Sequence, residues 1–347
     1  MSLRNVCTIL LYQNKSVCVN HNMKVSICER ICLDSRCVLY YNRCKGIVKN
    51  HRLIKEEYTM ANHVMENEYL RVTIADEGAE LISVWDKTLN QERIWTADPV
   101  FWNRHAPILF PFVGKVFGGK YRVGDKEYDM KTQHGFARDK VFACVAENAS
   151  SVTHCLTATE ETLAIYPYQF KLTICQQLDG KQLRIEWEIA NLGENEMYYS
   201  IGGHPGLMAP AGIRKEDCLF FFPGLEEPKY LFANDAGYIL PELKTLPMKD
   251  GFAAWQSDIS ATWIFEDHQV KTVGIAYPDG KPYVTMYCEE FPMLAIWANP
   301  DGPFICLEPW VGRADDDGFT GTVAEKKDMQ LLQSGEKHEI AYRIEFH

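Results

Sequence analysis

The residue best suited to acid–base chemistry in this chain of 347 residues is Glu308. It follows the apolar run Phe304–Leu307, which predicts a buried strand, and it precedes Pro309. Proline has no N–H for a sheet ladder, so we expect pairing to stop there or to lie at a sheet edge. A carboxylate fixed beside Trp310 is poorly solvated, which raises its pKa and suits a general base. A strand-end glutamate can equally pair with an arginine or cap a turn.

Two histidines lie in glycine-containing turns upstream. His134 precedes a glycine that leaves room for a ligand against the backbone, and Arg138, four residues on, could bind a polyol or an anion. His204 lies in the turn Gly202–Pro205 directly after a strand, where it has little freedom. Histidine titrates near neutrality, so His204 could act as a general acid. The alternatives are structural turn histidines and a surface ion pair of Arg138 with the next residue.

A third polar segment, Trp102–Lys115, places Arg104 and Lys115 on either side of a very apolar run. Both cations could simply form the charged rim of a core strand. Taken together, two histidines and one glutamate supply one base and one or two acids, and no nucleophilic serine or cysteine motif accompanies them. Tryptophan and phenylalanine neighbours offer faces for the C–H surfaces of a sugar. Such a set could move protons on a carbohydrate and would need no metal.

The rest of the chain from residue 61 alternates as short strands with turn signals between them, which predicts an all-β fold, a large antiparallel β-sandwich or barrel with few short helices. The strongest hairpin signal is Asp179-Gly180, for which we predict a type I′ turn. Similar signals are Gly124-Asp125 and Asp279-Gly280. One short helix is predicted over Thr322–Leu331. No Gly-rich phosphate loop, His-Glu-x-x-His or Gly-x-Ser-x-Gly motif occurs.

Composition narrows the class of protein. A net charge of −11 argues against nucleic acid or an anionic membrane as the main partner. The chain has no run of about 18 apolar residues, so we expect no membrane-spanning helix. No clear secretory signal is present, so we expect a cytoplasmic protein with reduced thiols. Six cysteines in apolar runs are predicted to be small buried residues: Cys144, Cys155, Cys175, Cys218, Cys288 and Cys306.

Residues 1–60 differ from the remainder. They hold ten Lys/Arg against four Asp/Glu, and half of the twelve cysteines fall before residue 45. The spacing of Cys28, Cys32, Cys37 and Cys44 could suggest a zinc knuckle or a disulfide cluster, but it matches no strong ligand pattern. We therefore interpret residues 1–60 as a poorly ordered, Cys-rich basic extension, with metal binding and targeting as the alternatives, and residues 61–347 as the folded domain.

Several motifs together resemble the aldose 1-epimerase family, the galactose mutarotase-like proteins, and within it the LacX-like branch. The resemblance runs from about residue 62 to 347 and rests on five stretches: Ala106–Gly114, His134–Asp139, Ile201–Gly206, Leu294–Trp297 and Cys306–Asp315. It implies a β-supersandwich fold and an isomerase that interconverts the α and β anomers of an aldose without a cofactor. The partner it implies is a small sugar, an aldohexose that could be phosphorylated. We expect a monomer or a weak homodimer.

The resemblance also implies roles for individual residues. Glu308 would take the proton of the anomeric hydroxyl, and His204 would protonate the ring oxygen. His134 would hydrogen-bond the sugar near these atoms. The substrate-binding residues would be Arg138, Arg104, Lys115 and Trp310.

Two departures from the family pattern bear on the substrate. Lys115 stands where the family usually has an arginine, and it lacks the bidentate fork. Ala261 stands where many members have a sugar-binding aspartate, and Asp258 and Asp267 are out of register. Three other functions therefore remain open: a carbohydrate-binding sensor, a hexose-6-phosphate mutarotase, and a glycoside hydrolase or lyase, which normally needs two carboxylates.

Overall fold

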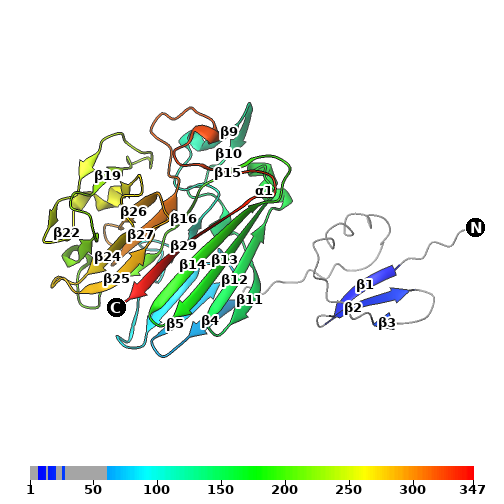
Figure 1. The fold of residues 1–347 in the computed structure, drawn as a ribbon, viewed down its shortest axis with the longest axis horizontal. Helices are drawn as coiled ribbons and strands as arrows, with labels where there is room; N and C mark the ends of the chain where they lie inside the picture. Colours follow the sequence, from blue (N-terminus) through cyan, green and yellow to red (C-terminus); the bar gives the residue numbers. More distant parts are fainter. Residues whose placement is uncertain (1–6, 13–14, 21–25, 28–60) are drawn as a thin grey trace, which may run out of the picture. The chain divides into compact units, whose positions relative to one another are not determined.

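The computed structural model describes residues 7–12, 15–20, 26–27 and 61–347, and the chain divides into two compact units, Met1–Tyr58 and Thr59–His347. In the first unit, three antiparallel strands form a small sheet (Figure 1): β1 (Cys7–Tyr12), β2 (Lys15–Asn20) and β3 (Ser26–Ile27). The rest of the predicted extension, with the four cysteines of the suggested zinc knuckle, lies outside the described residues. The predicted division at residue 60 stays a prediction.

The regular secondary structure of the second unit is mostly antiparallel strand, as the sequence predicted. Its largest sheet has ten strands, and its long strands lie side by side in Figure 1. In spatial order they are β11 (Ala143–Asn148), β12 (Ser151–Thr157), β13 (Phe170–Asp179), β14 (Gln182–Asn191), β29 (Lys337–Phe346), β25 (Pro282–Tyr287), β24 (Thr272–Ala276), β18 (Leu219–Phe221), β22 (Phe252–Ala254) and β21 (Met248–Lys249).

A second sheet of eight strands carries most of the predicted motifs. Seven strands follow one another in space, and β17 (Gly206–Met208) pairs with β27 beside them. The seven are β20 (Lys244–Thr245), β19 (Lys229–Phe232), β23 (Trp263–Phe265), β26 (Met293–Trp297), β27 (Phe304–Val311), β16 (Ile201–Gly203) and β8 (Ile108–Leu109).

Three smaller sheets complete the fold. The four-stranded one contains β4 (Asn62–Glu66), β5 (Leu70–Ala75), β6 (Leu81–Asp86) and β7 (Gln91–Glu92). The two-stranded ones pair β9 (Lys120–Val123) with β10 (Lys126–Asp129), and β15 (Met197–Tyr199) with β28 (Gln330–Leu332). The helices are α1 (Glu160–Ile165) and the 3₁₀ turns η2 (Phe117–Gly119), η3 (Ala137–Asp139), η4 (Lys215–Asp217), η5 (Ser257–Ala261) and η6 (Val323–Glu325). Among the helices of the described residues, none has the length and hydrophobicity needed to cross a membrane.

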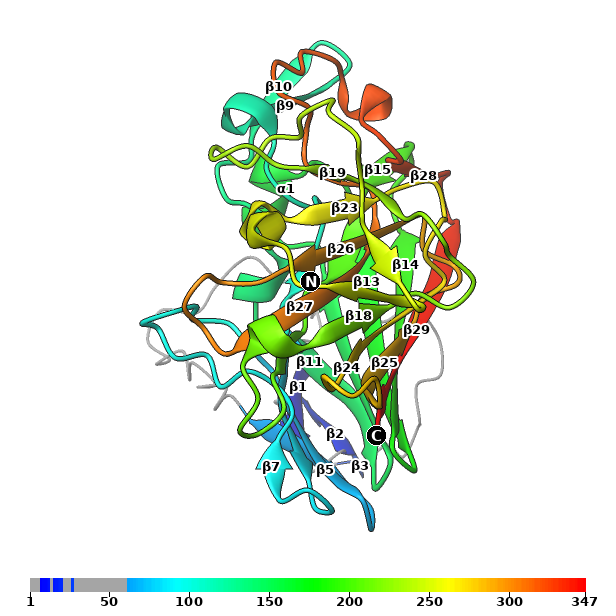
Figure 2. The same cartoon turned by 90° about the vertical axis from the view of Figure 1, so that its left-hand side faces the viewer.

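The core lies between the two large sheets. Alternate residues of β13 are buried, so one face of the ten-stranded sheet packs inward. Figure 2 shows β26 and β27 in front of β13 and β14. The sheets approach closely, because a Cβ on Gly203 of β16 would lie 2.8 Å from the hydroxyl oxygen of Tyr342 on β29. All eight residues of β27 are buried, as expected for a central strand covered on both faces.

Two local predictions were wrong in detail, and one helix was not predicted. The hairpin between β13 and β14 is present, but its two loop residues are Gly180 and Lys181, and only Gly180 has a positive φ (55°), so the turn is not type I′. The helix predicted over Thr322–Leu331 is only the turn η6, followed by strand β28. The helix that does form, α1, begins with a capping box at Thr159.

Pairing of β27 does not stop at Pro309, contrary to the prediction. Pro309 lies opposite Leu294 of β26. On its other side, β27 pairs with β17 at Cys306 and with β16 at Trp310, and the ladder is interrupted between these two points. A proline is tolerated in this central strand because it lies within that interruption.

The six cysteines of the second unit are free thiols, as predicted, but only Cys218, Cys288 and Cys306 are buried. Cys144 is partly exposed because it lies on the edge strand β11, and Cys155 and Cys175 because they project from the outer face of β12 and β13. The prediction of burial was wrong for these three.

Candidate active site

The carboxyl group of Glu308 lies at the centre of the eight-stranded sheet. Side chains alternate along β27, so Cys306, Glu308 and Trp310 share one face while Ile305 and Leu307 join the main core on the other. Glu308 has no exposed surface, and neither carboxyl oxygen has a hydrogen-bond partner within the described protein atoms. The strand therefore presents one polar group from an otherwise apolar wall.

His204 reaches the same place from the loop between β16 and β17. Its Nε2 lies 3.2 Å from Oε2 of Glu308, a direct contact without the alignment of a good hydrogen bond. Gly202, two residues earlier, allows this approach, because a Cβ there would lie 2.6 Å from a ring carbon of Trp310. The indole of Trp102 lies against His204, with ring centroids 4.8 Å apart.

Burial sets the protonation of this pair. Burial raises the pKa of Glu308 well above its usual value, and the Trp310 indole acts weakly in the opposite direction. Burial also lowers the pKa of His204 to about 3, assisted by the positive charge of Arg138. Both shifts favour the uncharged forms, so we expect a proton shared by the pair to rest on Glu308 and not on His204. The sequence-based expectation of a histidine titrating near neutrality was wrong for the unliganded protein.

His134 lies next to His204, with ring centroids 5.5 Å apart and nearly perpendicular planes. Its backbone N–H donates to the Gly114 carbonyl oxygen (2.8 Å), and the Gly114 N–H donates to His134 Nδ1 (3.0 Å). Burial lowers the pKa of His134 well below its usual value, with a further contribution from His204. The neutral ring must then carry its proton on Nε2, because Nδ1 accepts a hydrogen bond. That atom lies 2.7 Å from the amide nitrogen Nε2 of Gln133, so the amide must be turned over for its oxygen to accept the proton.

The loop that carries His134 depends on close backbone packing. His134 and Gly135 both have positive φ values, 67° and 68°. A Cβ on Gly135 would lie 2.3 Å from the carbonyl oxygen of Phe110, so only glycine fits. The Gly next to His134 in the sequence therefore shapes the turn.

These three side chains line one cavity of about 470 Å³, which is large enough for a monosaccharide. Of the other predicted site residues, Arg104, Arg138 and Trp310 also line it. Arg138 donates to the Gln133 carbonyl oxygen (2.7 Å), while its Nε is buried without a partner. Arg104 donates to the Arg138 carbonyl oxygen and forms an ion pair with Asp139.

Lys115 is the predicted site residue that the structure does not bring to the cavity. Its ammonium group donates to the carbonyl oxygen of Ala236 (2.8 Å), and its side chain packs on Gly237. The lysine thus supports a loop of the cavity wall.

Sequence reasoning missed three cavity residues: Gln133, Trp102 and Trp297. Both tryptophans contact the His204 ring, with centroids 4.8 Å and 5.7 Å away. Both tryptophans lie inside stretches that the sequence analysis had already marked, and Gln133 directly precedes one, so position in or beside a motif was the available signal.

The same cleft contains a possible metal-ligand set. One ligand atom each of His204, Cys306 and Glu308 lie within 4.8 Å of one another. Burial raises the pKa of the Cys306 thiol well above its usual value, with a further contribution from Glu308. The set is buried, and its imidazole and carboxyl are already in direct contact, which suits proton transfer between them.

Comparisons with known proteins agree with this fold. The family model described as aldose 1-epimerase matches residues 62–219. The chromosomal LacX protein of Lactococcus lactis subsp. lactis is 32% identical over 269 residues, which is 72% of this chain and 87% of that protein. The chain therefore belongs to the aldose 1-epimerase family, and within it to the LacX-like branch.

Two solved structures have the same fold. One is a galactose mutarotase related enzyme from Lactobacillus acidophilus, with a TM-score of 0.77 and 29% identity over 83% of this chain and 97% of that one. The other is a galactose mutarotase-like protein from Lactobacillus casei, with the same TM-score and identity over 83% of this chain and all of that one. They establish a galactose mutarotase-like β-sandwich for the second unit.

Proposed function

We propose that the protein is an aldose 1-epimerase that interconverts the α and β anomers of an aldose. The observation that carries the proposal is the contact between Glu308 and His204 in a sugar-sized cavity, 3.2 Å from Nε2 to Oε2. Family membership supports it, and this pair and His134 lie in the stretches on which the resemblance rests.

In the proposed reaction, the carboxylate of Glu308 removes the proton of the anomeric hydroxyl. A carbonyl forms at C1, the bond from C1 to the ring oxygen breaks, and that oxygen takes a proton from the imidazolium of His204. The open-chain aldehyde rotates about its C1–C2 bond. The reverse transfers close the ring on the other face of the carbonyl and return both protons, so the enzyme ends as it began.

The resting pair holds its proton on Glu308, whereas the reaction needs it on His204. Both arrangements contain one proton and have no net charge. The atoms are in direct contact, so the proton can pass between them without solvent. His134 needs no charge, because its neutral Nε2–H can donate a hydrogen bond to the ring oxygen or the anomeric oxygen.

Arg104 and Arg138 give a specific reason to test a phosphorylated sugar. Both line the cavity, and the buried Nε of Arg138 lacks a partner, so it is free to bind a hydroxyl or an anionic oxygen. A hexose 6-phosphate is therefore the second candidate substrate.

Polarimetry of freshly dissolved sugars tests the proposal. Added protein should accelerate the relaxation of at least one aldose or aldose 6-phosphate in a panel of both. Calorimetry on the same panel distinguishes an enzyme from a carbohydrate-binding sensor. If a sugar binds but its anomers interconvert no faster than without protein, the enzymatic proposal is contradicted. Release of reducing ends from oligosaccharides would instead favour a hydrolase.

A further inference from the structure

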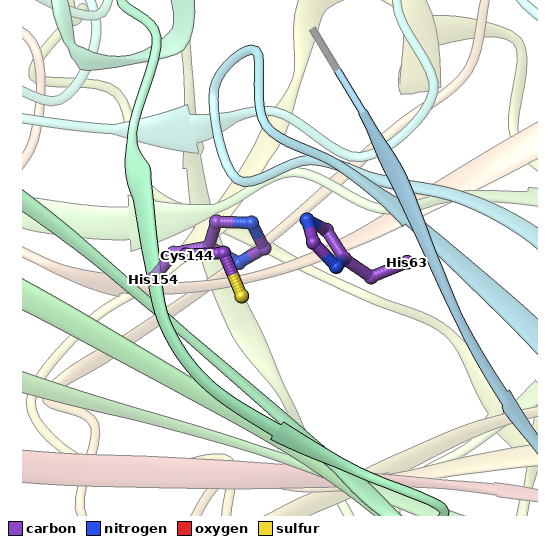
Figure 3. A group of neighbouring side chains, drawn as sticks. All are labelled: His63, Cys144 and His154. Atoms are coloured by element: carbon purple, nitrogen blue, oxygen red, sulfur yellow. The ribbon is translucent and has the colours of Figure 1, made fainter. Parts of the chain in front are cut away.

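A second group of histidines lies outside the candidate active site, where the four-stranded sheet meets the ten-stranded sheet. Figure 3 shows His63, which projects from β4, facing His154 and Cys144. One ligand atom of each lies within 4.8 Å of the other two. The imidazole rings of His63 and His154 have centroids 5.2 Å apart.

The sheet register explains why Cys144 and His154 point the same way. They are direct cross-strand partners on β11 and β12, and such partners project from the same face. A bulge follows immediately, between Cys144 and Ala146. Bulges bend a strand and re-aim its side chains, so Cys144 is turned toward the neighbouring sheet at this point. The buried positions on either side of His154 along this face, Val152 and Leu156, are apolar.

Two carboxylates surround the three side chains. One oxygen of Asp76 lies 2.9 Å from His63 Nε2 and 3.1 Å from His154 Nε2. The other oxygen of Asp76 accepts the N–H of Ala61 (2.9 Å). Glu147, on β11, contacts His63 Nδ1 and is 60% exposed. A carboxylate behind each imidazole is the usual companion of a metal-ligating histidine, because it fixes the ring and its tautomer.

One atom of the group is left without a partner. His154 has no exposed surface, and its Nδ1 has no hydrogen-bond partner within the described protein atoms. A buried, unpaired ring nitrogen costs free energy unless something binds it. With Asp76 on Nε2, Nδ1 is the nitrogen that this ring can offer to a cation.

We propose that His63, Cys144 and His154 bind one zinc ion, a function independent of the proposed sugar chemistry. Two imidazoles and a thiol form a donor set that zinc prefers in proteins, and tetrahedral coordination brings such atoms to about 3.5 Å from one another. Both ring nitrogens of His63 face carboxylates, so zinc would replace the contact of its Nδ1 with Glu147. The fourth position is open to the exposed carboxylate of Glu147 or to water.

A zinc ion at this site would link the edges of two sheets. β4 is the outermost strand of the four-stranded sheet and β11 that of the ten-stranded sheet. Unprotected edges are liable to pair with other chains. A zinc ion here would hold the edges in place and raise the stability of the folded domain, since it binds only where the three ligands are assembled.

Zinc titration of the full-length protein tests the proposal, with Cys144→Ser and His63→Gln as the variants and Cys155→Ser as the matched control. Cys155 is the next residue after His154, and it projects from the opposite face of β12. Wild type and Cys155→Ser should bind one more equivalent of zinc than Cys144→Ser, or bind it at least about 100-fold more tightly. Saturating zinc should raise the Tm of wild type by about 5 °C more than that of Cys144→Ser.

Cobalt(II) supplies an independent signature. Its complex with wild type should show a near-ultraviolet thiolate-to-metal band that Cys144→Ser lacks and Cys155→Ser keeps. If Cys144→Ser fails to fold, slower alkylation of Cys144 in zinc-loaded wild type, with unchanged alkylation of Cys155, supports the site. Equal zinc binding by wild type, Cys144→Ser and His63→Gln overturns the proposal. Loss of the extra equivalent only in Cys306→Ser also overturns it, because the ion would then lie in the sugar cleft.

Discussion

Two histidine clusters in one domain have different electrostatic surroundings. In the cleft, His134 and His204 have lowered pKa values, because they are buried and face Arg138, and burial raises the pKa of the nearby Glu308. At the sheet edges, contacts with Glu147 and Asp76 outweigh burial and raise the pKa of His63, whereas burial still lowers the pKa of His154.

The comparison shows that residue type alone does not determine the chemistry. The buried pair of Glu308 and His204, which shares one proton, suits proton transfer to and from a neutral sugar. Imidazoles oriented by carboxylates, with a partly exposed thiol beside them, suit a cation. The difference comes from the surroundings: a fully buried central strand in one case and two partly exposed sheet edges in the other.

Replacing one histidine by glutamine in each cluster should distinguish their roles most clearly. His204→Gln should lower kcat/KM for the anomer exchange by about 10³-fold, because it removes the group that protonates the ring oxygen. His154→Gln should retain at least a hundred times the activity of His204→Gln, although it removes a histidine that is equally buried. Polarimetry gives the rates, and circular dichroism checks the fold. Similar losses in both variants would contradict the distinction.

The cleft also depends on strained turns, whereas the edge cluster lies largely on regular strands. Gly135→Ala should destabilise the protein by at least ~3 kcal/mol, because its Cβ would lie 2.3 Å from the Phe110 carbonyl oxygen at a positive φ of 68°. Gly124→Ala is the matched control. It has a φ of 56° and open space, so only the backbone cost of about 1 kcal/mol remains. Urea unfolding measures both, and equal losses would contradict the packing argument.

The expected dependence of kcat/KM on pH is a smaller effect than those of the substitutions. A second proton enters the pair only near the lowered pKa of His204, about 3, and the shared proton leaves only above the raised pKa of Glu308. We therefore expect kcat/KM to change less than about twofold between roughly pH 5 and 7, where an ordinary histidine would titrate. An acid limb with a midpoint near 6.5 would show that His204 is not held neutral in the free enzyme.

Much of the fold could be predicted, because alternation of buried and exposed residues is a local property. The pairings of β9 with β10 and of β24 with β25 followed from their turn residues. Pro309 could not be placed, since its tolerance depends on an interrupted ladder formed by β16 and β17, about a hundred residues away in sequence. The type of the turn at Gly180 depended on one φ angle that composition does not fix.

The site was accessible from sequence only where residues lie in distinctive turns. Glu308, His204 and His134 stood in such turns or at a strand end. The pKa values could not be predicted, because they depend on burial by distant aromatic residues such as Trp102. Lys115 was misplaced because a charge next to a motif says nothing about which way its side chain points. Cys144 was interpreted as a buried apolar residue because the edge position of β11 appears only in the folded sheet.

The most direct test of the central claim is anomer exchange measured by NMR at equilibrium with Glu308→Gln. The exchange rate with this variant should equal the rate without protein, although the sugar still binds and the fold is intact. Glu289→Gln, the same change at an exposed position of the same unit, should exchange the anomers as fast as wild type. A Glu308→Gln protein that keeps more than about a tenth of the wild-type rate would contradict the assignment of Glu308 as the base.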